Sequence, residues 1–162
     1  MVKIHASLSS TNILLNTSRS FVVVTRRDSG FGISVHDLKV IDNLDDLLTI
    51  KTGRVWNARD RLMGNTKKDA YAFAKAAAGI GIKCVAKNIA DNSRYGGCFV
   101  GADAIKVHPV NANGEVGDGI TLVRIGKELY TPVEANRWLK EFASRFNVST
   151  YSFKALEKKF AK

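Results

Sequence analysis

The sequence has few cysteines and no long apolar run, and these two absences exclude several classes of protein. Cys84 and Cys98 are its only cysteines. They are too few for a disulfide scaffold and are not spaced as a CxxC pair, so we expect reduced thiols. No apolar run approaches the roughly 20 residues of a membrane-spanning helix, and the first ten residues lack the apolar core of a signal peptide. We therefore expect a cytoplasmic protein with no membrane partner.

The sequence also lacks the motifs of common catalytic and cofactor sites. No glycine-rich stretch continues into the GK[ST] helix start of a phosphate-binding loop. His5, His36 and His108 are scattered, and together with the two cysteines they do not show the spacing of zinc ligands. His36 and Asp37 are adjacent, and adjacent residues of a strand point to opposite faces, so they cannot line up as base and acid. We predict a protein that is not an enzyme and has no cofactor and no metal.

Positive charge is what the sequence has in excess. The 162 residues contain 25 Lys and Arg against 15 Asp and Glu, a formal net charge of +10, and the pI is about 9.8. A folded chain with such a surplus most often binds a polyanion, because neutralising phosphates releases condensed counterions. The hydrophobic content of 45% is ordinary for a globular protein. Nucleic acid is therefore the first partner that the composition predicts.

Residues 18–42 predict a twisted β-hairpin with a basic turn. Residues 21–24 form a short β-branched and aromatic run, and residues 38–41 end a second one. Between the runs lie Arg26, Arg27 and Asp28, followed by Gly30 and Gly32, and Gly and Asp adopt turn conformations at little steric cost. Guanidinium groups on an exposed turn can pair bidentately with phosphate. We therefore expect this hairpin to contact nucleic acid.

The hairpin resembles the KOW motif of small SH3-like or Tudor-like barrels in nucleic-acid-associated proteins. A hydrophobic strand, a basic loop with glycines and a second apolar strand carry the resemblance, whereas Ser18 to Ser20 replace the usual glycine before the first strand. The opening residues 1–27, with the length and basicity of the chain, also resemble the early DNA-binding proteins of T-even bacteriophages. That resemblance implies a small, largely nonspecific DNA-binding protein that alters host transcription and the host nucleoid. It assigns a DNA-contact role only to the loop from Arg26 to Gly32 and its flanking strands.

Residues 1–64 are predicted to be a β-rich module. Besides the hairpin, short strands are expected at 2–8 and 12–16, a helical turn at 43–48, and a further strand in two pieces, 48–50 and 54–56. Five short strands in 60 residues suggest a small barrel. Arg54, Arg59 and Arg61 bracket Trp56 in the sequence, which would suit stacking on a base or sugar beside phosphate contacts. The alternative is that Trp56 belongs to the core and the arginines are solvated.

Residues 65–162 are predicted to form an α/β module. Asn65 or Thr66 can cap a helix that Gly79 closes, and Lys67 and Lys68 in its first turn oppose the helix dipole unless an anion lies nearby. A strand is expected at 80–86 and a buried strand at 98–100. A hairpin of 105–110 with 120–125 is expected around the Asn113-Gly114 turn, and Pro109 argues that its first strand lies at a sheet edge.

The last third predicts two helices joined by a short turn. Thr131, Pro132 and Glu134 form a capping box before an apolar stripe, which predicts a helix over 132–146. A turn is expected at Asn147, Val148 and Ser149 with a second helix after it, and Asn147 tolerates the left-handed conformation that such a turn needs. The spacing fits a helix-turn-helix that would direct Thr150, Tyr151, Lys154 and Lys158 into the major groove, and it equally fits a helical hairpin that only packs.

The predicted fold is therefore α+β, a small SH3/Tudor-like (KOW-like) β-barrel followed by an α/β module that ends in a two-helix hairpin. The predicted function is nonspecific binding of double-stranded DNA, with host nucleoid or transcription proteins as further partners. Alternatives are an RNA-binding module and a host-protein-binding inhibitor with a basic surface. The residues predicted to contact DNA are Arg19, Arg26, Arg27, Lys51, Arg54, Arg59, Arg61, Lys67, Lys68, Tyr151, Lys154, Lys158 and Lys159.

Overall fold

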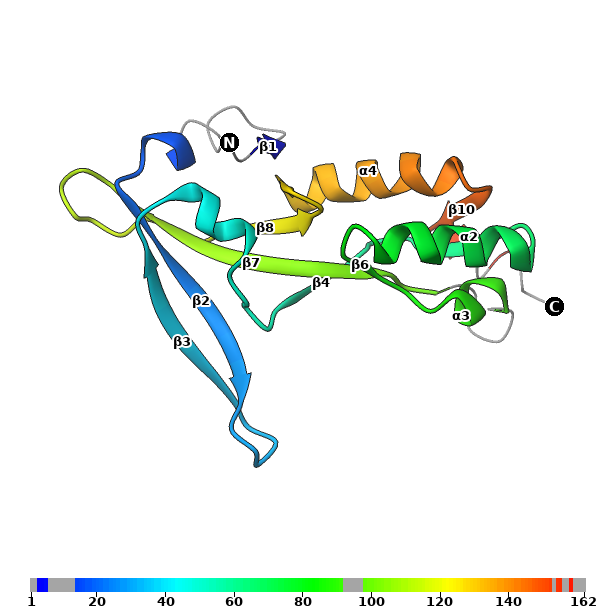
Figure 1. Ribbon diagram of the computed structural model, residues 1–162, viewed down its shortest axis with the longest axis horizontal. Helices are drawn as coiled ribbons and strands as arrows, with labels where there is room; N and C mark the ends of the chain where they lie inside the picture. The colour runs from blue at the N-terminus through cyan, green and yellow to red at the C-terminus, as the bar shows by residue number, and fades with distance from the viewer. Residues whose placement is uncertain (1–2, 6–13, 92–97, 153, 156–157, 159–162) are drawn as a thin grey trace. The chain divides into compact units, whose positions relative to one another are not determined.

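The computed structural model describes residues 3–5, 14–91, 98–152, 154–155 and 158 (Figure 1). Its elements are β1 (Lys3–His5), β2 (Ser20–Asp28), β3 (Ser34–Ile41), the 3-10 helix η1 (Leu44–Leu48), β4 (Val55–Asn57), β5 (Arg61–Gly64), α2 (Lys67–Ala78), β6 (Ile82–Lys83), α3 (Ala86–Ala90), β7 (Gly101–Val110), β8 (Ile120–Ile125), β9 (Glu128–Tyr130), α4 (Pro132–Ser144) and β10 (Val148–Tyr151). The predicted α+β class is confirmed. None of the helices in these ranges has the length and apolar character needed to cross a membrane.

The main sheet is open. Its strands follow the order β1-β9-β8-β7-β2-β3, and every neighbouring pair is antiparallel except β1 with β9. The described strands do not close this sheet into the predicted small barrel. The prediction drew only on residues 1–64, whereas β2 takes β7 as a neighbour, and β7 follows the predicted module in the sequence. Residues 14–17 are moreover helical and not part of the strand predicted at 12–16, and Leu48 ends η1 instead of starting a strand.

The chain divides into two compact units, each discontinuous in sequence. The first unit comprises Met1–Trp56 and Asp103–Glu134, and the second unit comprises Asn57–Ala102 and Ala135–Lys162. The boundary predicted near Gly64 falls inside the second unit.

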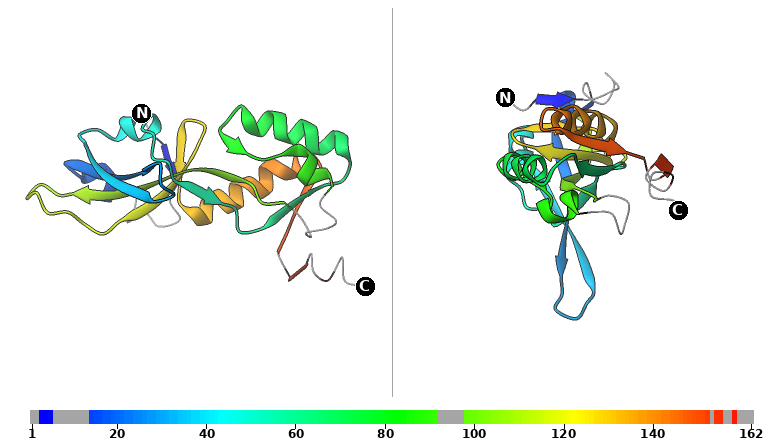
Figure 2. Two further views of the ribbon diagram at one scale, coloured as in Figure 1. Left: turned by 90° about the horizontal axis from the view of Figure 1, so that it is seen from below. Right: turned by 90° about the vertical axis from the view of Figure 1, so that its right-hand side faces the viewer.

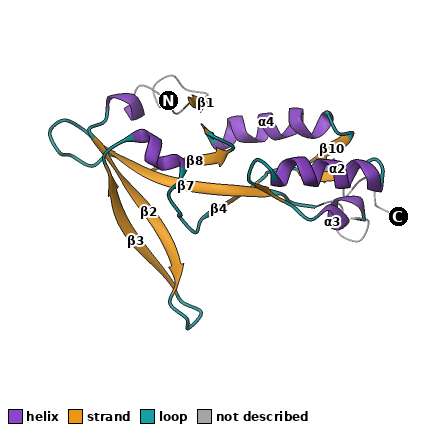
Figure 3. Cartoon of the chain, viewed as in Figure 1, coloured by secondary structure: helices purple, strands orange, loops and turns teal. Residues whose placement is uncertain are grey.

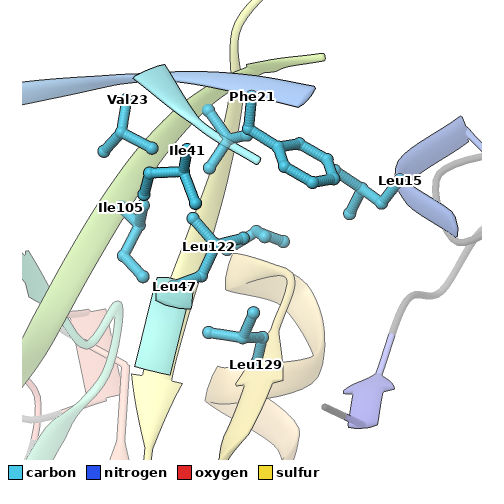
Figure 4. Packing of buried hydrophobic residues seen from close by; sticks show 9 residues of the cluster. Leu15, Phe21, Val23, Ile41, Leu47, Ile105, Leu122 and Leu129 are labelled. Carbon is cyan, nitrogen blue, oxygen red and sulfur yellow. The ribbon is translucent and has the colours of Figure 1, made fainter. Parts of the chain in front are cut away.

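The core of the first unit lies on one face of the sheet. Along β2 the inward side chains are Phe21, Val23 and Thr25, which are buried, whereas those between them are only half-buried. This period of two is what a strand with one covered face requires. Figure 4 shows the resulting cluster, to which β2, β3, η1, β7, β8 and β9 contribute. Its buried members are Leu15, Phe21, Val23, Ile41, Leu47, Ile105, Val107, Leu122 and Leu129.

The β2–β3 hairpin is confirmed, but its arginines lie elsewhere than predicted. The strands pair from Phe21 with Ile41 to Asp28 with Ser34. The turn is closed by a hydrogen bond of 3.0 Å from the Ser29 amide to the Ile33 carbonyl. Because β2 continues to Asp28, Arg26 and Arg27 lie on the strand and not at the tip of the turn.

The β7–β8 hairpin is also confirmed, whereas the position of Pro109 was predicted wrongly. β7 is an inner strand with β2 on one side and β8 on the other. Pro109 is tolerated there because β8 pairs only with Asp103 to Val107, so Pro109 lies beyond the end of that pairing. Its carbonyl instead accepts a hydrogen bond from the Gly117 amide at 2.7 Å.

The second unit packs α2 and α4 through aromatic side chains. α2 begins after the predicted cap, where the Thr66 hydroxyl accepts a hydrogen bond from the Asp69 amide at 3.1 Å, and α4 follows the predicted cap at Thr131. Phe73 of α2 is fully buried and lies 5.6 Å, ring centre to ring centre, from Phe142 of α4. Trp138 stacks on the same ring at 4.8 Å. Figure 3 shows both helices in the cartoon of the chain.

The predicted second C-terminal helix is wrong at its start. Residues Val148–Tyr151 form β10, which pairs antiparallel with β5, so Val148 lies opposite Gly64 and Tyr151 opposite Arg61. Asn147 adopts the expected left-handed conformation, with φ of 56°, but it leads into a strand. A helix-turn-helix is therefore excluded at this position. Likewise only Ile82–Lys83 of the residues predicted at 80–86 form a paired strand, and Ala86–Ala90 form the helix α3.

Candidate nucleic-acid interface

The whole positive surplus of the chain lies in one of its two units. Counted over the sequence, the first unit has ten Lys and Arg against ten Asp and Glu, a net charge of zero. The second unit has fifteen Lys and Arg against five Asp and Glu, a net charge of +10. Neither unit is continuous in sequence, so this segregation is hidden when charge is summed along the chain. The second unit is consequently the stronger candidate for contact with a polyanion.

The exposed face of α2 carries basic and aromatic side chains. Ala70, Phe73 and Ala77 are buried, so the opposite face of the helix is turned to solvent. There Lys68 and Lys75 flank Tyr71, whose exposed fraction is 56%. Spacings of three and four residues place these three side chains on one stripe. Such a stripe can pair lysines with successive phosphates while the tyrosine contacts a sugar or base.

The first turn of α2 adds positive charge where a helix least tolerates it. Lys67 and Lys68 are both exposed and start the helix directly after its cap. Cations near a helix N-terminus oppose the macrodipole, at a cost of about 0.3 to 1 kcal/mol each. An anion held by these side chains would remove that cost. Among the described residues no carboxylate oxygen lies within 4.0 Å of either ammonium group.

A polar hollow of about 360 Å³ lies beside this turn. Its lining residues are Asn65, Lys140, Ser144, Asn147, Val148, Ser149 and Thr150. Asn65 immediately precedes the helix cap, and its amide donates a hydrogen bond of 3.1 Å to the Asn147 carbonyl. Among the described lining residues Lys140 is the one charged side chain, and none of them is a carboxylate. The hollow thus offers hydroxyl and amide donors and one cation to an anionic group.

The two-stranded sheet of the second unit holds two more of the predicted residues, and a third, Arg59, lies just before it. Arg61 of β5 lies opposite Tyr151 of β10, and its guanidinium carbon lies 3.6 Å from the centre of the Phe99 ring. This cation-π contact holds the guanidinium against an aromatic face. Arg59 is exposed, and its Nε lies 3.6 Å from a carboxylate oxygen of Asp60, so part of its charge is neutralised locally. The predicted arginines therefore differ in how much positive charge they present.

The remaining predicted lysines of the second unit follow β10. Lys154 and Lys158 are helical and exposed. Lys159 lies outside the described residues. Because Thr150 and Tyr151 belong to a paired strand, they do not lie on one helical face with Lys154 and Lys158, as the groove hypothesis required.

The thiols of the second unit do not reduce its positive charge at neutral pH. The pKa of Cys84 is raised to about 11, mainly by burial and in smaller part by the nearby Cys98. Burial also raises the pKa of Cys98, and the positive charge of Arg61 acts in the opposite direction. Both groups are therefore uncharged thiols at pH 7. No three His, Cys, Asp or Glu side chains are grouped as metal ligands in the part of the chain that the structure describes.

In the first unit Arg26 and Arg27 line a hollow of about 390 Å³, but their guanidinium groups already have partners. Arg26 donates to the Ser34 hydroxyl from Nε at 2.9 Å and from Nη2 at 2.6 Å. Arg27 Nε lies 2.8 Å from Asp37 Oδ2. Asp28, a second carboxylate, also lines the hollow. Arg26 retains its full charge, whereas that of Arg27 is compensated by its neighbour.

The base of this hollow is fixed by close backbone packing. The Arg26 amide donates to the Thr52 carbonyl at 2.6 Å. Gly53 follows with φ of +67°, and a Cβ atom there would clash with the Arg26 carbonyl oxygen. Only glycine fits this position, both sterically and conformationally.

The other predicted residues of the first unit do not line this hollow, and they differ in exposure. Arg19 and Lys51 are exposed, and Arg54 and Trp56 are half-buried. Trp56 is therefore neither a fully buried core residue nor a fully exposed platform. Arg54 belongs to the first unit, whereas Arg59 and Arg61 belong to the second, so the bracket predicted around Trp56 is divided between the units.

Seven exposed residues of the second unit were not among those predicted to contact DNA, and six of them are basic. On α2 the stripe could have been found, because Lys75 lies seven residues after Lys68 and opposite the apolar residues Ala70, Phe73 and Ala77. The others come together in one unit only through folding. The missed exposed residues are Tyr71, Lys75, Lys83, Lys87, Arg137, Lys140 and Arg145.

Comparison with known proteins does not identify the chain. No protein-family model, no curated protein and no solved structure matches it.

Proposed function

We propose that this chain is a non-catalytic protein that binds double-stranded DNA largely without regard to sequence, through the surface of its second unit. The observation that carries the proposal is the segregation of charge: the second unit has a net charge of +10, and the first unit is neutral. Phosphate contacts supply nearly all of the free energy of nonspecific DNA binding.

The side chains of the second unit suit phosphate contacts better than base readout. Lysines predominate on its described exposed surface, and a lysine acts as a mobile point charge that does not impose the bidentate geometry of arginine. Lys67, Lys68 and Lys75 supply such charges along α2, and Lys140 supplies one at the polar hollow. Contacts of this kind fix a protein on the duplex but carry no sequence information. Low sequence specificity follows from this composition.

The biological setting is part of the same proposal. The resemblance of the opening residues to early DNA-binding proteins of T-even bacteriophages supports a role in altering the host nucleoid or host transcription. The resemblance to SH3-like and Tudor-like barrels is limited to the β2–β3 hairpin. This hairpin has two strands, basic residues and glycines, as a KOW motif does, but it belongs to an open sheet.

A salt titration with three polyanions tests the proposal. The full-length chain is titrated with two unrelated duplex DNAs, a single-stranded RNA and heparin, and fluorescence anisotropy is recorded at several salt concentrations. We expect similar affinity for both duplexes, weaker binding of the RNA, and a logarithm of affinity that falls linearly with the logarithm of salt by about 0.9 for each phosphate contacted. Affinity that does not change with salt contradicts the proposal, and preference for the RNA replaces it with RNA binding.

A protein partner is tested separately. The tagged chain is recovered from cells with and without nuclease treatment. Loss of associated host proteins after nuclease treatment agrees with an association through DNA. Host proteins retained in stoichiometric amount, together with no DNA binding in the titration, would establish a protein-binding inhibitor instead.

A further inference from the structure

The outer edge of β3 is an unusual surface for a soluble sheet. β3 is the last strand in the sheet order, with β2 on one side and no described strand on the other. Two of its apolar side chains are largely exposed, Leu38 at 71% and Val40 at 70%. Natural proteins usually shorten, charge or cover an edge of this kind, because it is ready to pair with another strand. Figures 1 and 2 show β2 and β3 as a two-stranded ribbon.

The backbone groups at this edge can be assigned from one hydrogen bond. The Arg26 amide donates to the Thr52 carbonyl and so points away from β3. Arg26 lies opposite His36 in the β2–β3 pair, which makes this a pair without mutual hydrogen bonds. His36 therefore directs its own N–H and C=O toward the outer edge. By the alternation of an antiparallel ladder, Leu38 and Val40 do the same.

We infer that a second copy of this chain pairs with this edge, strand β3 against strand β3, antiparallel, with the two-fold axis at Leu38. In that register Leu38 lies opposite Leu38 of the second copy, and His36 lies opposite Val40. All these residues direct their amides outward, so they form the hydrogen-bonded pairs of the new ladder. The pairing is isologous and closes after two copies.

Charge complementarity selects this register. With the axis at Leu38, Asp37 of each copy lies opposite Lys39 of the other, in the pairs without mutual hydrogen bonds, where side chains approach most closely. Asp37 Oδ2 pairs with Arg27 of its own copy, and Asp37 Oδ1 can accept a hydrogen bond from Lys39 of the other copy. An axis at His36 would place Lys39 opposite Ile33, and an axis at Val40 would place it opposite Ile41. Only the register centred on Leu38 makes two opposite-charge pairs.

The apolar side chains support the same arrangement. Leu38 lies opposite Val24 within the hairpin, and Val40 lies opposite Val22, so these four residues share one face of the ribbon. Pairing brings the two Leu38 side chains together and extends this apolar face across the axis.

The dimer should be weak. Two short strands bury less area than the interface of a permanent dimer, so we expect a dissociation constant in roughly the micromolar range. Where the proposed DNA binding holds, such a dimer carries two basic units and can bridge two DNA segments.

A pair of cysteine variants with matched exposure tests the register. In the inferred dimer the Cα atoms of the two Leu38 residues are about 5.5 Å apart, within the roughly 4.4 to 6.8 Å of disulfides. The two Val40 residues are separated by four residues along the strands, about 14 Å. Under mild oxidation Leu38→Cys should give at least a tenfold larger dimer fraction on non-reducing gels than Val40→Cys. The wild-type chain, with its native Cys84 and Cys98, supplies the background. Equal cross-linking of the two variants overturns the register.

Sedimentation velocity tests the dimer without cysteine chemistry. The wild-type chain should shift from monomer to dimer as its concentration rises. Lys39→Asp should raise the dissociation constant roughly tenfold, because it replaces two attractive cross-strand pairs by two repulsive ones. Circular dichroism confirms that the variant is folded. A wild-type chain that stays monomeric up to its solubility limit overturns the inference. These measurements contain no nucleic acid, so their failure is distinct from a failure of DNA binding.

Discussion

Because the positive surplus lies in the second unit, DNA affinity should depend on the charges of that unit and not only on the total charge of the chain. Two double variants each remove two positive charges from the chain. Lys67→Gln with Lys68→Gln acts on the first turn of α2, in the second unit. Arg26→Gln with Arg27→Gln acts on β2, in the neutral first unit. If only total charge mattered, the two variants would lose the same DNA affinity.

The expected losses follow from counterion release. Each phosphate neutralised on duplex DNA contributes about 0.9 to the salt slope, which at about 0.1 M salt is worth about eightfold in affinity relative to 1 M. Loss of Lys67 and Lys68 should therefore weaken binding about 60-fold at that salt concentration and lower the slope by about 1.8. The charge of Arg27 is compensated by Asp37 at 2.8 Å. The arginine variant should accordingly lose about eightfold or less, with a slope change of at most about 0.9.

Thermal unfolding supplies the control for folding. Both lysines oppose the dipole of α2, so their replacement should leave the melting temperature unchanged or raise it, since each opposing charge costs about 0.3 to 1 kcal/mol. A loss of affinity in a protein that is at least as stable as the wild type cannot come from misfolding. Fluorescence anisotropy titrations on one duplex at several salt concentrations give the affinities and slopes. Equal losses in the two variants, or a larger loss in the arginine variant, would refute the assignment of the interface to the second unit.

Three further predictions concern stability and thiol chemistry. Arg124, whose side chain is 12% exposed, donates from Nη1 to the carbonyls of Leu47 and Ile50 at 2.9 Å each, so Arg124→Ala should lower the free energy of unfolding by about 2 to 4 kcal/mol in urea denaturation. Asn147 has φ of 56°, so Asn147→Gly should be neutral or stabilising and Asn147→Ala should cost about 1 kcal/mol in the same assay. Burial raises the pKa of Cys84 to about 11, so its alkylation should be slow at pH 8 and should accelerate as the pH rises toward 11. An alkylation rate that has already reached its maximum at pH 9 would contradict the burial of this thiol. Because the thiol of the unfolded chain ionises near pH 9, its contribution to the free energy of unfolding is fully present below that pH and is lost as the pH rises through the folded pKa.

Several elements could be predicted because short-range sequence determines them. The helices α2 and α4 begin where Thr66 and Thr131 offer a hydroxyl to an amide three residues later, which is a property of four consecutive residues. The β2–β3 and β7–β8 hairpins likewise follow from glycine turns between apolar runs. Even the left-handed Asn147 was expected from its residue type.

Other elements depend on partners that are distant in the sequence. Residues 147–149 were predicted to be a turn and the residues after them to begin a helix, yet Val148–Tyr151 form β10, because β5 offers them a strand to pair with. Val148 lies opposite Gly64, more than eighty residues earlier, so no local pattern could favour the strand. The described strands form an open sheet and not the predicted barrel for the same reason, since β2 pairs with β3 on one side and on the other with β7, which lies beyond the first 64 residues.

The sequence by itself determined the amount of charge, the caps and the hairpins, since these depend on composition or on residues a few positions apart. Only the tertiary structure decided where the charge lies. Two discontinuous stretches, 57–102 and 135–162, fold into one unit and gather the entire surplus there. In the same way, Asp37 reaches Arg27 only because the hairpin places the two strands side by side. Phosphate and carboxylate act on side chains across space, so the surface available to a polyanion is a property of the folded chain.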